Sequence, residues 1–67
     1  MNVELPYEIG TVLKTKNQEK IRFNKVHHYI IAGNMVYVVL EFCHSPDSRL
    51  SDPIPLEELQ QKWEISN

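Results

Sequence analysis

What this 67-residue chain lacks already excludes several classes of function. It has one cysteine, so it cannot form a disulfide within itself, and we expect a reducing, cytoplasmic environment. Its two glycines are too few to build either nucleotide-binding fingerprint. The apolar runs are too short to cross a bilayer, and the first four residues lack the basic and apolar regions of a signal peptide. We therefore expect no membrane association.

A strong excess of charge of one sign is also missing. Seven basic residues face nine acidic ones, and the net charge of −2 gives no general attraction for nucleic acid. The basic residues are nevertheless unevenly spread, because five of the seven lie between positions 14 and 25. Four of them form a candidate basic patch: Lys14, Lys16, Lys20 and Arg22.

Size limits the chain to a single domain, 1–67. A domain this small buries only about 60% of the surface of its unfolded chain, so its core is small and a deep substrate cavity is disfavoured. The composition, 42% hydrophobic and 24% charged, is that of an ordinary globular domain. These bounds favour a binding module over an enzyme.

Segments rich in β-branched and aromatic residues, separated by polar turns, predict a mostly β structure. Gly10 within the first segment indicates a bulge or a close backbone approach, and Asn17 suits a left-handed turn. The turn at Gly33-Asn34 joins the two longest segments into a hairpin that carries most of the strongly apolar residues. The predicted strands are 7–16, 20–31, 35–44, 50–54 and 63–65, with a loop at 45–49.

One helix is predicted over 55–62. Pro55 suits a first helical position, acidic residues occupy the first turn, and Lys62 in the last turn complements the helix dipole. Leu56, Leu59 and Trp63 follow at i, i+3 and i+7, which places them on one face.

Two registers compete for the central hairpin. A two-residue turn would place Lys25 opposite Phe42. A three-residue turn would place Lys25 opposite Glu41 and Tyr29 opposite Tyr37. We favour the second register, because it forms an opposite-charge pair and an aromatic pair, each worth roughly 0.2–1 kcal/mol.

The favoured register assigns the two faces of the hairpin. The core face would carry Val26, His28, Ile30, Val36, Val38, Leu40 and Phe42. The other face would carry Phe23, Lys25, His27, Tyr29, Met35, Tyr37, Val39, Glu41 and Cys43. A histidine in the core is anomalous: either its ring finds partners at the sheet edge, or a bulge within 20–26 redirects it. A buried neutral histidine would make the fold unstable near pH 5.

The succession of strand, turn, long bent strand, tight hairpin, short strand, short helix and final strand resembles the small SH3-like β-barrels. The resemblance covers nearly the whole chain and rests on layout and strand length. It implies an all-β (β-rich) fold, a barrel of about five strands with one short helix near the C-terminus, and a binding role. The acidic and aromatic loop pattern of signalling SH3 domains, which hold proline-rich peptides, is absent.

No catalytic, metal or cofactor site is predicted. His27 and His28 should face opposite ways on a regular strand, and Cys43 would lie roughly 13 Å from His27 along the sheet. Zinc needs its ligands about 2 Å from one centre. Cys43 and His44 would likewise point to opposite sides, and the acidic residues of 47–58 are explained by capping and solvation.

Surfaces are better candidates. In the favoured register Lys25, His27, Tyr29 and Tyr37 lie together on the face away from the core. This candidate binding surface suits a protein partner or a homodimer, since tyrosines anchor interfaces. The alternative is a single-stranded nucleic acid, bound by the basic patch with the hairpin tyrosines as stacking faces. We therefore expect a non-enzymatic interaction module, with nucleic-acid binding as the alternative.

Overall fold

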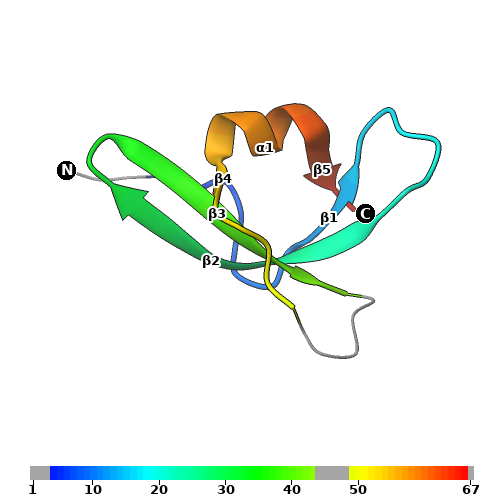
Figure 1. Ribbon diagram of the computed structural model, residues 1–67, viewed down its shortest axis with the longest axis horizontal. Helices are drawn as coiled ribbons and strands as arrows, with labels where there is room; N and C mark the ends of the chain where they lie inside the picture. The colour runs from blue at the N-terminus through cyan, green and yellow to red at the C-terminus, as the bar shows by residue number, and fades with distance from the viewer. Residues whose placement is uncertain (1–3, 44–48, 67) are drawn as a thin grey trace.

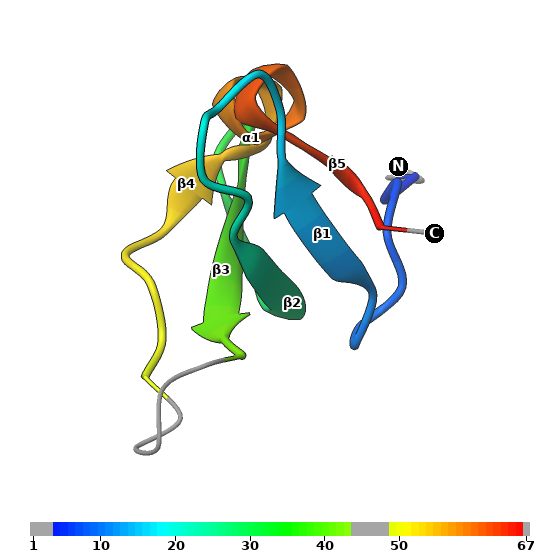
Figure 2. The same ribbon diagram turned by 90° about the vertical axis from the view of Figure 1, so that its right-hand side faces the viewer.

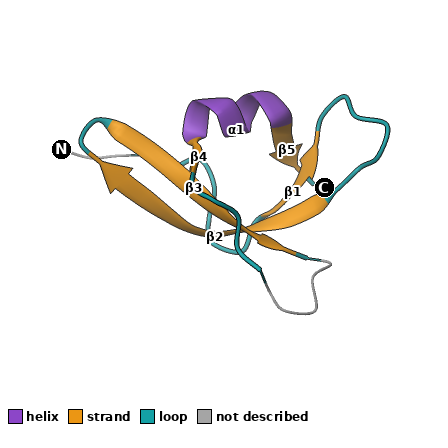
Figure 3. Ribbon diagram, in the orientation of Figure 1, coloured by secondary structure: helices purple, strands orange, loops and turns teal. Residues whose placement is uncertain are grey.

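A computed structural model describes residues 4–43 and 49–66 and places one antiparallel five-stranded sheet beside one short helix (Figure 1, Figure 3). The elements are β1 Val12–Thr15, β2 Phe23–Ala32, β3 Met35–Phe42, β4 Ile54–Pro55, α1 Leu56–Lys62 and β5 Trp63–Ile65. The strand order is β4-β3-β2-β1-β5. The predicted strand-rich fold with one short C-terminal helix is confirmed. The predicted loop at 45–49 lies outside the described residues except for Arg49.

The first strand is shorter than predicted because the chain turns before it. Thr11 donates its backbone N–H to the carbonyl of Glu8, and Gly10 has a φ of +92°, which favours glycine. Gly10 also donates to the carbonyl of Val26 at 2.8 Å. A Cβ at Gly10 would meet nothing within 4 Å, so the predicted close backbone approach is wrong and the positive φ is what favours glycine here. Asn17 adopts the predicted left-handed conformation, with a φ of 52°.

The central hairpin contains both competing registers. Lys25 lies opposite Glu41, as in the favoured register, whereas Ala32 and Met35 flank a two-residue turn, as in the other. A bulge between Val26 and His28 joins the two halves. The extra residue in β2 is therefore His27, just beyond the segment in which a bulge was predicted.

The bulge corrects the predicted faces near the turn. Beyond it Tyr29 lies opposite Val38 and Ile30 opposite Tyr37, so the predicted pairing of Tyr29 with Tyr37 is wrong. Side chains alternate along a strand, so Tyr29 comes to the core side with Val38, and His28 comes to the outer side. His28 is half-buried and is not part of the core cluster, so the stated reason for unfolding near pH 5 no longer holds.

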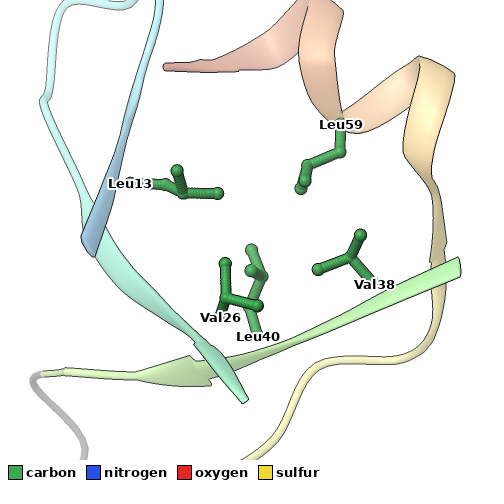
Figure 4. Packing of buried hydrophobic residues seen from close by; sticks show 5 residues of the cluster. All are labelled: Leu13, Val26, Val38, Leu40 and Leu59. Carbon is green, nitrogen blue, oxygen red and sulfur yellow. The ribbon is translucent and has the colours of Figure 1, made fainter. Parts of the chain in front are cut away.

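The core is a cluster of five side chains from four elements that point toward one another (Figure 4). β1, β2 and β3 supply four of them and α1 supplies Leu59, each with a relative exposure of 1% or less. The members are Leu13, Val26, Val38, Leu40 and Leu59. Of the residues predicted for the core face, Ile30 and Phe42 are instead 37% exposed. Phe42 lies at the end of β3, and Ile30 lies beyond the bulge.

The helix connects the two edges of the sheet. β4 pairs with β3 at one edge, β5 pairs with β1 at the other, and α1 runs directly between them (Figure 2). In the described residues no ladder joins β4 to β5, so the sheet is strongly curved but is not a closed barrel.

Candidate functional site

The candidate binding surface is not assembled as one patch. Lys25 lies on the outer side and its ammonium is 3.6 Å from the Glu41 carboxylate, so the predicted charge pair is confirmed. Tyr37 is half-buried opposite Pro55 of β4. His27 occupies the bulge, and Tyr29 packs against the core. The register change thus separates Tyr29 from the other three residues.

Tyr29 connects the hairpin to the N-terminal segment. Its hydroxyl donates to the Tyr7 carbonyl at 2.8 Å and accepts the Tyr7 backbone N–H at 3.0 Å. Burial raises the pKa of the Tyr29 phenol, the Tyr7 backbone hydrogen bond lowers it, and charge on the Tyr7 phenol raises it further. A phenol bound and half-covered in this way is not a free stacking platform.

The candidate basic patch is split by the C-terminal segment. Lys14 lies opposite Glu64 in the β1–β5 ladder, and the Lys16 ammonium donates to the Gln60 carbonyl at 2.7 Å. Lys20 and Arg22 are exposed in the connection between β1 and β2. Two of the four cations thus lie beside the C-terminal segment, and none lies at the hairpin tip with Tyr37.

The sequence interpretation missed the tip of the central hairpin. Beyond the last pairing with β1, the hairpin extends past the other labelled helix and strands (Figure 1). Three large apolar side chains are exposed there: Ile30 by 37%, Ile31 by 55% and Met35 by 47%. The signal in the sequence is that 26–40 contains no Asp, Glu, Lys or Arg, although it includes an exposed turn.

Along one edge of the tip, backbone groups have no hydrogen-bond partner among the described residues. Leu40 of β3 exchanges hydrogen bonds with Ser51, so its backbone groups point away from β2. The direction of the backbone groups repeats at every second residue, so the N–H and C=O of Val36 also point away from β2. Its partner Ile31 therefore directs its N–H and C=O to the outer edge of β2. Among the described strands, none pairs with that edge beyond Val26.

The opposite side of the tip is hollowed. A groove of about 260 Å³ lies between the start of β3 and the start of α1. Val36, Pro55 and Leu56 supply apolar walls, and Glu57 is the one ionisable residue among those that line it. The tip therefore combines an apolar groove with an apolar strand edge.

Among the described residues, two histidine side chains lie close together. The bulge brings the rings of His27 and His28 to a centroid separation of 5.0 Å, so the expectation that they face opposite ways is wrong. Cys43 is exposed, and His44 lies outside the described residues. In residues 4–43 and 49–66 no group of three or more His, Cys, Asp or Glu could hold a metal. Over the same residues, no helix is long and apolar enough to cross a membrane.

Comparisons with family models, with curated proteins and with solved structures found no match for this chain.

Proposed function

We propose that this chain is a non-enzymatic binding module with the layout of a small SH3-like barrel, and that a protein partner docks by adding a strand to the outer edge of β2. The partner is a second copy or another protein. The observation that carries the proposal is the tip of the hairpin, where exposed Ile30 and Ile31 accompany an edge that no described strand covers.

Strand addition suits the chemistry of this edge. The backbone groups of Ile31 point outward, so an extended segment could pair with them while its side chains contact the apolar tip. Exposed edges are normally protected by lysine, proline or inward-pointing charge, and 29–32 carries none of these. The proposed SH3-like layout rests on the order of the elements. The proposed cytoplasmic location rests on the single cysteine.

The test blocks the edge without changing the β2–β3 ladder. Ile31→Pro removes an N–H that points outward, and proline is tolerated on edge strands in that orientation. Ile65→Pro is the matched control: Ser66 bonds to Val12 and Lys62 to Lys16, so the N–H of Ile65 points away from β1, to an edge that no described strand covers. Ile65 has a similar exposure, 46%, but lies on β5, away from the tip.

The measurements are sedimentation across a concentration series and affinity capture with each variant as bait. We expect a homodimer or a saturable partner that Ile31→Pro loses and Ile65→Pro keeps, with unchanged circular dichroism. A wild-type monomer that captures the same proteins as Ile31→Pro contradicts the proposal. Binding of an oligonucleotide that weakens steeply with salt and requires Lys20 and Arg22 would replace it with the nucleic-acid alternative.

A further inference from the structure

The bulge in β2 brings two imidazole nitrogens unusually close together. His27 Nδ1 and His28 Nδ1 are 2.7 Å apart, with the rings at 75° to each other. A neutral imidazole carries a proton on one nitrogen and a lone pair on the other. At this distance one Nδ1 donates to the other, so a single proton lies between two converging nitrogens.

We propose that His27 and His28 form a two-histidine site for a late divalent transition metal. The shared proton moves to Nε2 of the donor ring, and the metal takes its place between the two Nδ1 atoms. Metal–imidazole bonds are about 2.0–2.1 Å, so two nitrogens at a right angle on one metal are about 2.9 Å apart. The observed 2.7 Å requires only a small opening of the pair and rotation of the two rings.

Geometry also favours particular metals. A tetrahedral angle would separate the two nitrogens by about 3.3 Å, further from the observed spacing than the right angle is. Square-planar and octahedral ions provide right angles, and imidazole suits both Cu²⁺ and Ni²⁺. Since no third His, Cys, Asp or Glu joins the pair within the described residues, water or an outside ligand would complete the coordination.

The backbone that carries the pair is fixed on both sides. Val26, immediately before the bulge, is buried in the core at 1% exposure. Val39, which lies opposite His28, is 4% exposed. His27 itself is exposed and His28 is half-buried, so solvent reaches the two rings while the buried neighbours hold the backbone that carries them. The inference does not depend on the proposed function, because it rests on the bulge and not on the free edge.

The test is calorimetric titration of the full chain with Ni²⁺, which avoids the oxidation of Cys43 that Cu²⁺ would bring. We expect His27→Gln and His28→Gln each to weaken binding about tenfold or more, since both nitrogens are ligands. His44→Gln and Cys43→Ser are the matched controls and should bind as the wild type does. The proposal is overturned if either histidine variant binds Ni²⁺ as tightly as the wild type does. It is also overturned if either control loses as much affinity as the histidine variants do.

A second readout uses the wild type alone and does not depend on how the variants fold. Octahedral Ni²⁺, in which water completes the coordination, is paramagnetic and should broaden the amide resonances of His27, His28 and Val39 first. Broadening that begins at Cys43 instead places the metal elsewhere and contradicts the site.

Discussion

The Tyr29 hydroxyl is the contact by which one side chain connects the hairpin to the segment before β1. It serves as donor and acceptor to the same residue, Tyr7, so two backbone groups of that segment depend on it. Removing the Tyr29 hydroxyl would leave the N–H and C=O of Tyr7 without their hydrogen-bond partner, whereas the packing contacts of the Tyr29 ring would remain.

Tyr29→Phe should therefore lower the free energy of unfolding by about 1 kcal/mol at neutral pH. Urea unfolding followed by Trp63 fluorescence measures the change. Tyr37→Phe is the matched control, because it removes a phenol hydroxyl and leaves the Tyr29–Tyr7 contacts in place. A loss in Tyr37→Phe equal to that in Tyr29→Phe would contradict the role given to these hydrogen bonds.

The same phenol should make stability depend on alkaline pH. Burial raises the Tyr29 pKa in the folded state above its ordinary value of 10.0, so the folded protein holds this proton more tightly than the unfolded chain does. The resulting stabilisation is complete below the ordinary value and is lost as pH rises through the raised pKa. Wild-type stability should therefore fall more steeply than that of Tyr29→Phe above about pH 10. Parallel urea curves for the two proteins across that range would contradict this prediction.

At the scale of the element, the bulge in β2 reconciles the two registers that compete in the sequence. The charge pair of Lys25 and Glu41 requires one register, and the two-residue Gly33-Asn34 turn requires the other. One additional residue in one strand satisfies both and adds twist and bend. Because His27 is that additional residue, its neighbours Val26 and His28 keep the regular alternation of inner and outer sides.

Deletion of His27 should leave both halves of the hairpin paired as they are. Without the bulge the strand loses local twist, so β2 should fit less well against β1, and we expect a destabilisation of about 1–2 kcal/mol. Amide hydrogen exchange measures this: protection should fall in β1 and β5 while it persists in β3. His27→Ala, which keeps the residue count, is the control and should leave the exchange of β1 unchanged.

The sequence predicts the elements better than it predicts their faces. The proline and the charge pattern of 55–62 and the turn at Gly33-Asn34 are local features, so the helix and the hairpin follow directly from them, with Pro55 just before the helix and not within it. Register depends on small differences between pair energies, and a choice of one register along the whole hairpin misplaced Tyr29 and His28. The candidate surface inherited that error, and Ile30, one of the three exposed apolar residues of the tip, was assigned to the core face.

For the molecule as a whole, a single small cluster holds the fold together. Its five members come from β1, β2, β3 and α1, so each of these elements depends on the others for burial. A domain of this size is stabilised by only roughly 3–10 kcal/mol, which makes any one core side chain a large share of the total.

Leu59→Ala should destabilise the protein by about 2–5 kcal/mol, a large share of its total stability. Thermal unfolding followed by circular dichroism measures the effect. Leu56→Ala is the matched control: Leu56 lies on the same helix and packs against the cluster but is only half-buried, so its loss should cost clearly less. Equal losses would show that α1 covers the sheet without a specific contribution from Leu59.

Because α1 lies directly between β4 and β5 in the chain, it also acts as a spacer between the two edges of the sheet. Its seven residues span about 10 Å, and the chain enters β4 and β5 directly at its two ends, so this length limits how far apart the two sheet edges can lie. An added helical turn would widen that opening and carry Leu59 away from its partners, whereas a shorter connection would draw the edges toward closure. The separation of the β4 and β5 edges is therefore limited by a segment that belongs to neither strand, and it could be adjusted by changing the number of residues in α1 alone.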